Sequence, residues 1–362
     1  MKNGFSSIRN VQAIMSMDPF QSTWITTEEE RSPYVELKAN KDYWDEGRGP
    51  KLNRVIFRND LTPKQALHLC TATEGEVDIV TGVAPEDAVT VLQSTHAKLV
   101  AVNGKRILAG SFNRYKKDVN FNNRNLRLSF NLAVDREALI KEGFNGYAQP
   151  VPALTPPWAF DFPKGLSPRT FDPERARYLL KKSGWPKERA LKLSGEKEFE
   201  KALKVLGDQF RKALNLKVDV EVISPPQQAA WKKMVAEKKL VPSFDIALFS
   251  PMAFFYEGTP AFFHREYFGN NGAFRTGPVI PEFQQLFKRM AAETDREKLL
   301  EHSKKIDEYV YEEALGLFLC SPQELYAVNR HVNFVPYRTT FELAETSVSH
   351  EHWSLKGKHP KV

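Results

Sequence analysis

Long apolar runs, cysteines and recognisable catalytic motifs are all scarce in this 362-residue sequence. No apolar stretch approaches the about 20 residues that a membrane-spanning helix requires. The first thirty residues show no apolar core followed by a small-residue cleavage site. The sequence therefore predicts no membrane-spanning segment and no secretory signal within this chain. With 41% hydrophobic and 27% charged residues, its composition is that of a globular protein.

Cysteine is rare, with Cys70 and Cys320 as the two examples in the whole chain. Cys70 falls on the face of a predicted helix beside Ala66 and Leu67, and Cys320 ends an apolar run. Both positions predict small buried side chains. A disulfide between them is the alternative in an oxidising compartment, but their spacing does not establish the approach that a disulfide needs.

Signatures of catalytic and metal sites are also missing. The sequence has no Gly-rich phosphate loop, no G-x-S-x-G elbow, no H-E-x-x-H and no paired C-x-x-C. Its one histidine cluster, His350 and His352 with His359, lies in a charged tail, where alternate residues cannot share a helix face. We therefore predict a solvated terminus there, and no enzyme, no catalytic residue, no cofactor and no metal.

A strong excess of charge of one sign is absent as well, since the formal charge is +7 in a chain with 52 Lys and Arg. The lysine pairs are scattered among residues of both signs, whereas nucleic-acid binders collect them on one face beside aromatic or groove-reading elements. They predict solvated helix faces and no nucleic-acid partner, and a weak preference for anionic partners stays open.

What the sequence does contain is a regular alternation of strand and helix patterns. The chain is longer than one ordinary core accommodates, so two lobes are expected. The alternation predicts an α/β fold, with a largely parallel sheet in the first lobe. The strand patterns cover residues 34–40, 54–58, 76–80, 98–102, 107–115, 191–193, 218–223, 244–248, 315–320 and 325–328. The helix patterns cover residues 62–74, 85–94, 173–183, 197–214, 226–237 and 294–311, the last headed by a capping box at Thr294–Glu297.

The stretch from Asn123 to Pro157 carries the clearest local signals. Asn123 is a fair N-cap for a short helix with one apolar face, and Asp135 is placed to cap a second helix. The second helix is expected to end near Gly143 or Gly146, because the prolines that follow forbid its continuation.

These residues resemble a known family, the family 5 solute-binding proteins of ABC importers, which include oligopeptide, dipeptide and nickel binders. The matches to the family's R-x-A-l-x-x-A-x-D-R … G-x-A-x-P pattern are Arg127, Ala133, Asp135, Arg136, Gly146 and the prolines, with Ser129 in place of the usual early alanine. Further matches are A-N-x-D-Y-W at Ala39–Trp44, G-E-V-D-I at Gly75–Ile79, and D-P-x-x-A-x-x-L-L-x-x-x-G-W at Asp172–Trp185. The resemblance covers about Pro19 to Val335.

The resemblance implies an α/β, periplasmic-binding-protein-like fold of type II, cluster C, with two lobes. Lobe I would comprise residues 1–110 and 322–362, lobe III residues 111–321, with hinge crossings near 107–112 and 318–325. The family carries a signal sequence, further strands and an auxiliary lobe ahead of the Gly-Pro-Phe strand start that Asp18-Pro19-Phe20 resembles. The chain is therefore expected to be N-terminally truncated, with an incomplete lobe I.

The function implied by the resemblance is that of an extracytoplasmic solute-binding protein of an ABC importer. It would close two lobes over a small solute, peptide-like or other, with no bond made or broken. The implied partners are the ligand and the ABC permease subunits, and the protein is expected to act as a monomer in the periplasm or at the cell surface. The alternative is a cytoplasmic sensor or interaction module, or a non-functional truncated copy, built on the same fold.

The segment Phe249–Phe263 is the predicted ligand surface, because it carries many aromatic residues after a strand end, where α/β proteins place ligands. The structural alternative is a hydrophobic plug beneath a loop.

In the family a tryptophan and an acid of this segment face the ligand, whereas their positions here hold Met252 and Phe255, with Glu257 as a displaced carboxylate nearby. This departure favours an apolar or uncharged ligand, because a buried amine without a counter-charge is costly. The candidate ligand contacts are Phe112, Arg114, Tyr115, Phe249, Phe254, Phe255, Tyr256 and Glu257.

Overall fold

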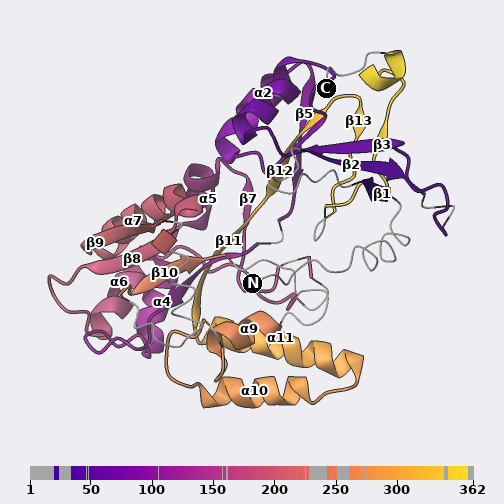
Figure 1. Cartoon of the computed structure of the whole chain (residues 1–362). Coiled ribbons are helices and arrows are strands. Elements are labelled where there is room, and N and C mark those ends of the chain that lie inside the picture. The colour runs from indigo at the N-terminus through magenta and orange to yellow at the C-terminus, as the bar shows by residue number, and fades with distance from the viewer. Residues whose placement is uncertain are drawn as a thin grey trace, which may run out of the picture. The chain divides into compact units, whose positions relative to one another are not determined.

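The computed structural model divides the chain into two compact units, Met1–Val102 with Glu324–Val362, and Asn103–Gln323 (Figure 1). It describes residues 20–23, 34–45, 47, 49–104, 106–156, 158–159, 162–224, 226–227, 243–250, 261–272, 274–337 and 341–357. The chain thus passes between the units after Val102 and after Gln323. The first of these points lies before the segment 107–112 in which a hinge is expected, and the second lies within 318–325. The assignment of these units as hinged lobes stays a prediction.

The unit Asn103–Gln323 is built on a six-stranded mixed sheet with the order β7-β11-β6-β10-β8-β9. β8 pairs parallel with both β9 and β10, whereas β6 pairs antiparallel with β10 and β11, and β11 antiparallel with β7. The strands are β6 (Leu108–Phe112), β7 (Ala148–Pro150), β8 (Leu191–Glu196), β9 (Val218–Ile223), β10 (Ile246–Phe249) and β11 (Gly316–Pro322).

Helices cover both faces of this sheet, which gives a three-layer α/β/α unit (Figure 1). The helices on one face are α4 (Arg124–Leu132), α5 (Arg136–Phe144), α6 (Pro173–Lys182) and α7 (Glu200–Leu214). Those on the other face are α9 (Ala261–Phe268), α10 (Pro281–Ala291) and α11 (Arg296–Glu312). Side chains along β6 alternate between the two cores, since Leu108 and Phe112 pack with α4–α7 and Ala109 packs with α9–α11.

The predicted caps of α4 and α5 are confirmed. The Asn123 side chain accepts a hydrogen bond from the backbone N–H of Asn125, and the Asp135 carboxylate accepts one from the N–H of Ala138. α5 ends at Phe144, after which Asn145 adopts a left-handed conformation at φ 50° and Gly146 follows at φ 85°. Glycine relieves the backbone strain that a side chain would cause there, which explains why the helix stops at this point.

Two buried arginines connect these helices to β11 and to the residues just before it. Arg127 donates to the backbone carbonyls of Phe121, Asn122, Glu313 and Ala314. Arg136 donates to the carbonyls of Asn131, Val134, Arg169 and Phe318. Burial lowers the pKa of both arginines to about 10. The arginines of the family motif therefore have a structural role, since each satisfies several carbonyls from distant segments.

The other unit contains two three-stranded antiparallel sheets and a small β13–β14 pair. The first sheet consists of β1 (Phe20–Thr23), β2 (Tyr34–Ala39) and β3 (Arg54–Arg58). The second consists of β4 (Ile79–Thr81), β12 (Glu324–Asn329) and β5 (Ala97–Val102), beside which α2 (Pro63–Ala72) and α3 (Ala88–Gln93) pack. Short elements complete this unit, namely β13 (Val332–Asn333), β14 (Ser347–Val348) and the 3-10 turns Pro85–Asp87 and Trp353–Lys356.

The prediction of a largely parallel sheet in this unit is wrong. β12 lies between β4 and β5 and pairs antiparallel with both. β12 comes from more than 200 residues further along the chain, so the local alternation of helix and strand patterns carries no sign of its insertion.

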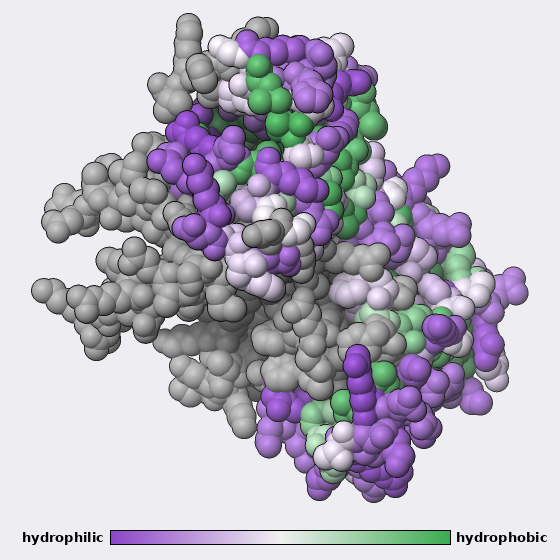
Figure 2. Space-filling model, turned by 90° about the vertical axis from the view of Figure 1, so that its right-hand side faces the viewer, coloured by the Kyte–Doolittle hydropathy of each residue, from purple (hydrophilic) through white to green (hydrophobic). Residues whose placement is uncertain are grey.

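The long helix α11 begins one residue later than the sequence pattern indicates. Its N-cap is Asp295, whose carboxylate accepts from the N–H of Lys298, so the predicted Thr294–Glu297 capping box is wrong. A capping box that the sequence analysis did not single out occurs at α2, where Thr62 and Gln65 bond reciprocally. The outer surface of the α10–α11 region is predominantly hydrophilic in Figure 2, as two amphipathic helices require.

The histidine tail also differs from its prediction. The His352 side chain is buried, and its Nε2 lies 3.1 Å from Asp78 Oδ1. The same carboxylate oxygen accepts from the indole N–H of Trp353 at 2.8 Å. The segment is therefore docked on its own unit through Asp78, and the predicted solvated terminus is wrong for His352. The predicted helix 226–237 and the strand start at Pro19 lie almost wholly outside the described residues.

Both cysteines are buried free thiols, as predicted. Burial raises the pKa of Cys70 to about 12 and raises that of Cys320 further still. Since only the thiolate reacts with disulfide reagents, we expect both residues to be labelled by dithionitrobenzoate at pH 8 at least about 100-fold more slowly in the native protein than in guanidinium chloride. Stoichiometric labelling of the native protein at the unfolded rate would contradict this prediction.

Candidate functional site

One edge of the six-stranded sheet gathers the carboxyl ends of β8, β9 and β10. In the register, Glu196 at the end of β8 pairs with Ile223 at the end of β9, and Phe249 at the end of β10 pairs with Ala109 near the start of β6. Because β11 is antiparallel to β6, its last residues lie at this edge as well. The chain enters the unit just before β6 and leaves it just after β11, so we call this the crossing edge. α/β proteins bind ligands outside the carboxyl ends of parallel strands.

The predicted ligand residues lie at opposite edges of the sheet. Phe112 pairs with Ile246 at the start of β10, whereas Phe249 pairs with Ala109. Three residues of an antiparallel strand span roughly 10 Å, and Arg114 and Tyr115 lie beyond Phe112. The structure therefore separates Phe249 from the other three described candidates. Phe254, Phe255, Tyr256 and Glu257 lie outside the described residues.

Phe112 is a core residue. Its side chain is 1% exposed, and its ring stacks on Phe121 with centroids 5.7 Å apart and lies 6.2 Å from the ring of Phe130. A solute would reach this ring only if the core opened, so we remove Phe112 from the candidate contacts. Phe112 was predicted as a ligand contact from its position in the strand alone. In a central strand, however, successive side chains point alternately into two buried cores.

Arg114 has a structural role in the same region. Its backbone N–H donates to Thr276 O, its guanidinium donates to Pro278 O, and its side chain packs against Gly277. Burial, with a smaller effect of the nearby Arg275, lowers the pKa of Arg114 to about 10. The side chain of Tyr115 is 45% exposed. Arg114 thus holds the loop after α9 against β6, and neither residue lies at the crossing edge.

A buried ion cluster occupies this opposite edge. Asp245 is fully buried and accepts two hydrogen bonds from Arg189, at 2.7 and 2.8 Å, and a third from the N–H of Lys192. Arg189 also pairs with Asp118 at 2.8 Å, and its guanidinium carbon lies 5.0 Å from the centre of the Trp185 ring. Since every acceptor and donor of the pair is used internally, the cluster is structural.

Phe249 begins an aromatic stack at the crossing edge. Its ring stacks on Tyr267 of α9 with centroids 4.1 Å apart, and Tyr267 stacks on Phe274 at 5.4 Å. Burial raises the pKa of Tyr267, so this phenol stays neutral. The Oγ atom of Ser250, the next residue, is buried and has no hydrogen-bond partner in the described part of the chain. An aromatic wall beside an unsatisfied hydroxyl suits a ligand that has both apolar and hydrogen-bonding groups.

The crossing edge also carries polar residues that the sequence analysis did not select. Arg106 forms an ion pair with Glu198, which lies in the turn after β8, with 2.5 Å between Nη1 and Oε1. Trp158 donates its indole N–H to Gly104 O, and Ser321 donates to Arg106 O. The sequence feature that could have indicated some of these residues is their position next to strand ends. Which strand ends lie together becomes clear only once the order of the strands in the sheet is known.

The described residues hold no group of three or more His, Cys, Asp or Glu placed to bind a metal ion. Within the same residues, no helix combines the length and apolar character needed to cross a membrane.

Comparison with known proteins identifies the family. Residues 11–273 match the model of the bacterial extracellular solute-binding proteins, family 5 Middle. The chain is 29% identical over 217 residues to the glutathione-binding protein GsiB of Salmonella paratyphi A, a match that covers 59% of this chain and 40% of the relative. The Escherichia coli K12 protein of the same name is 28% identical over 212 residues, 58% of this chain and 39% of the relative. The chain thus spans about two fifths of the curated relatives it matches.

Solved structures show the same fold. The substrate-binding protein CtaP of Listeria monocytogenes matches with a TM-score of 0.77 at 19% identity, covering 92% of this chain and 66% of that one. DppA of Helicobacter pylori in complex with the peptide STSA matches with a TM-score of 0.67 at 20% identity, covering 91% of this chain and 62% of that one. The predicted periplasmic-binding-protein-like α/β fold is thereby confirmed. Family members bind substrates and are not enzymes, in agreement with the prediction. Because the family model matches residues 11–273, which is most of the chain, this chain belongs to the bacterial extracellular solute-binding proteins of family 5.

Proposed function

We propose that the chain is the solute-binding component of an ABC importer and binds a small, peptide-like solute by closure of its two units. The observation that carries this proposal is the convergence at the crossing edge. Both passages of the chain between units, the carboxyl ends of three parallel strands and the Phe249 stack lie at that edge. Rotation about the backbone near Val102 and Gln323 would bring the other unit over the ligand.

The residues at this edge favour a ligand with mixed chemistry. Phe249 offers a flat apolar surface, and the Ser250 hydroxyl offers a hydrogen bond. The Arg106–Glu198 pair is partly exposed, with 33% of the arginine and 56% of the glutamate side chain accessible, so both charges lie near the surface. A ligand with a carboxylate and an amine would find a counter-charge for each, which departs from the sequence-based expectation of an apolar or uncharged solute.

The partners and place of action follow from the same proposal. The chain would act as a monomer outside the cytoplasm and deliver its solute to ABC permease subunits. Phe254, Phe255, Tyr256 and Glu257 remain predicted contacts, because they follow closely in the sequence after Phe249, which lies at the crossing edge.

The test is a binding assay with defined probes: glutathione, the tetrapeptide Ser-Thr-Ser-Ala and the nickel–histidine complex. A bound probe should reduce the radius of gyration in X-ray scattering, which reports closure directly. Phe249→Ala should weaken binding of that probe at least about fivefold, because an aromatic contact in a binding site contributes about 1 kcal/mol or more.

Tyr115→Ala is the matched control, since it removes an exposed aromatic ring at the opposite edge of the same sheet. It should leave the affinity unchanged. Equal effects of the two substitutions would reject the crossing edge as the binding surface, and binding without any change in scattering would reject closure.

A further inference from the structure

The positive charge of the chain is concentrated in one part of the Asn103–Gln323 unit. Residues 164–217 contain fifteen Lys and Arg against seven Asp and Glu, an excess of eight, whereas the whole chain carries +7. The lysine pairs were predicted to be scattered, whereas the charge excess of this segment exceeds the entire net charge. It comprises α6, β8 and α7, which are neighbours in the fold.

A stripe of exposed residues runs along α6. Arg175, Tyr178 and Lys182 follow one another at three- and four-residue spacing, so these three lie on one side of the helix, and Phe171 lies just before its N-cap Asp172. The side chains of Phe171 and Tyr178 are 43% and 63% exposed. Ala176, Leu179 and Leu180 of α6 pack in the core, whereas the residues of the stripe are exposed to solvent. We call these four residues the α6 stripe.

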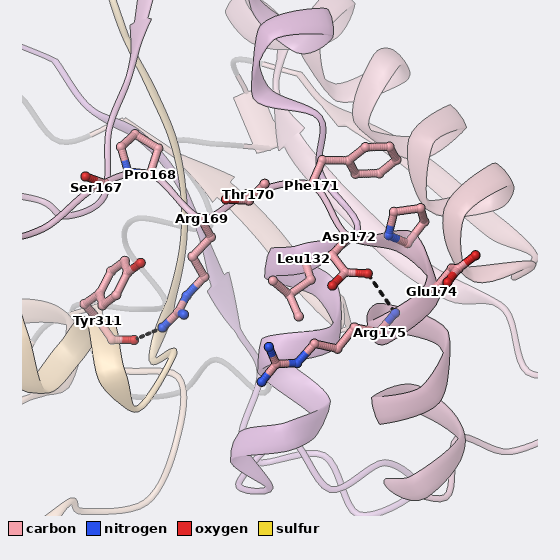
Figure 3. A pocket seen from close by; sticks show the side chains of 11 residues that line it. Leu132, Ser167, Pro168, Arg169, Thr170, Phe171, Asp172, Glu174, Arg175 and Tyr311 are labelled. Atoms are coloured by element: carbon pink, nitrogen blue, oxygen red, sulfur yellow. Dashed lines mark hydrogen bonds between the residues drawn. The ribbon is translucent and has the colours of Figure 1, made fainter.

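The stripe leads into an open pocket of about 670 Å³ that Phe171 and Arg175 help to line (Figure 3). Arg169 forms another wall, where its guanidinium carbon lies 4.0 Å from the centre of the Tyr311 ring and its Nη2 donates to Tyr311 O. In Figure 3 the side chain of Arg175 extends across the pocket toward Arg169, while that of Glu174 points the other way. The pocket therefore presents two guanidinium groups from different segments.

These cations form no close ion pair with a carboxylate in the part of the chain that the structure describes. Burial lowers the pKa of Arg169, and Glu312 lies near enough to oppose part of this effect. No ion pair involves Arg169, Arg175 or Lys182, whereas the lysines and arginines of α7 are largely paired, as in Lys204–Glu200 and Arg211–Asp208. The carboxylate of Asp172 is occupied as the N-cap of α6, where it accepts from the N–H of Arg175. The charge of the stripe and pocket is thus left for an external anion.

We propose that the α6 stripe and its pocket form a docking surface for an anionic phospholipid membrane, with lipid phosphate groups between Arg169 and Arg175. Guanidinium groups bind phosphate through several hydrogen bonds, and exposed aromatic side chains beside cations prefer the headgroup region of a bilayer. The openness of the pocket and the solvent-facing aromatic rings favour an extended surface over a free anion, which would bury neither ring. This inference stands independently of the proposed solute site, because the stripe lies on the outer side of α6.

The test is flotation of the full chain with vesicles of phosphatidylcholine alone and with 30% phosphatidylglycerol. The protein should float with the anionic vesicles at 50 mM NaCl, and binding should fall steeply at 300 mM because of screening. Removal of one basic contact weakens attraction to an anionic surface roughly fivefold. Charge reversal at Arg175 and Lys182, R175E/K182E, should therefore reduce the partition coefficient by at least about 25-fold.

The matched control is K288E/R289E on α10, which makes the same change of net charge at two exposed residues of the same unit. It should reduce partitioning no more than threefold. Phe171→Ser with Tyr178→Ser should also weaken binding, at unchanged charge. The urea midpoint of each variant shows whether it is folded. If R175E/K182E has a changed midpoint, it is replaced by R175Q/K182Q, for which the loss of two basic contacts predicts a decrease of about 25-fold.

Three results would overturn the proposal. The first is no binding to anionic vesicles at 50 mM NaCl. The second is equal losses in the stripe and control variants, which would show an effect of net charge alone. The third is full competition by 10 mM inorganic phosphate at constant ionic strength, which would assign the pocket to a free anion.

Discussion

Replacement of Arg136 by methionine is expected to lower the free energy of unfolding by about 3–5 kcal/mol. Arg136 is 5% exposed and donates hydrogen bonds to four backbone carbonyls. The shortest of these reaches Phe318 O at 2.9 Å, in the central part of β11. Methionine fills a similar volume but leaves these carbonyls without their donor. A buried acceptor that loses its partner costs about 1–3 kcal/mol.

The desolvation of the guanidinium opposes this effect. Burial lowers the pKa of Arg136 to about 10, which shows that the charged form is disfavoured by its surroundings. If desolvation outweighed the hydrogen bonds, methionine would be neutral or stabilising, as it can be when a whole buried ion pair is replaced. Here the acceptors stay in place after the substitution, so we expect the loss of hydrogen bonds to dominate.

The measurement is urea unfolding followed by near-ultraviolet circular dichroism, with amide hydrogen exchange to locate the effect. Protection should fall mainly in α5 and β11, which Arg136 connects. Arg289→Met is the control, because Arg289 lies exposed on α10. It should change the stability by less than about 0.5 kcal/mol. An effect of Arg136→Met below about 1 kcal/mol would show that the arginine does not hold these segments together.

Replacement of Asp245 by alanine is expected to cost a similar amount, about 3–5 kcal/mol. Asp245 is fully buried and binds Arg189 in two-point geometry. Its removal leaves a guanidinium in a mostly buried position with Asp118 as its remaining carboxylate, and Asp118 is itself 59% exposed. The second carboxylate is too well solvated to replace the first, so the charge is left poorly compensated.

A double-mutant cycle separates the pair from its surroundings. Asp245→Ala combined with Arg189→Ala should cost less than the sum of the single substitutions by about 2 kcal/mol, because each single variant leaves one charge unpaired. Asp208→Ala is the surface control, since Asp208 pairs with Arg211 at an exposed position of α7. It should change the stability by at most about 1 kcal/mol. Additive effects at Asp245 and Arg189 would mean that the two side chains do not interact.

Local signals in the sequence predicted much of the fold. Asn123 and Asp135 were identified as N-caps because a side-chain oxygen must satisfy free amides at a helix start, and this requirement involves only neighbouring residues. The strand at 218–223 was predicted with its observed bounds, because its apolar and polar residues alternate. At α11, however, Thr294 and Asp295 are both good caps, and the sequence pattern alone favoured the wrong one.

The candidate site was predicted less well, for a topological reason. Phe249 was selected because it follows a strand end, and the structure places it at the crossing edge. Arg114 and Tyr115 were selected by their place at the end of the strand predicted at 107–115. The antiparallel pairing of β6 with β10 puts them at the far edge, and no local pattern shows the direction of a partner strand.

The sequence by itself determined the α/β class, the family and the approximate positions of many elements, because these depend on periodicity, capping and motifs within short windows. Only the tertiary structure decided the strand order, the insertion of β12 between β4 and β5, and the gathering of Arg106, Glu198 and Phe249 at one edge. Those features depend on pairings between residues tens to hundreds of positions apart. Such pairings form because they bury both faces of the sheet at once, and each strand supplies only part of each face.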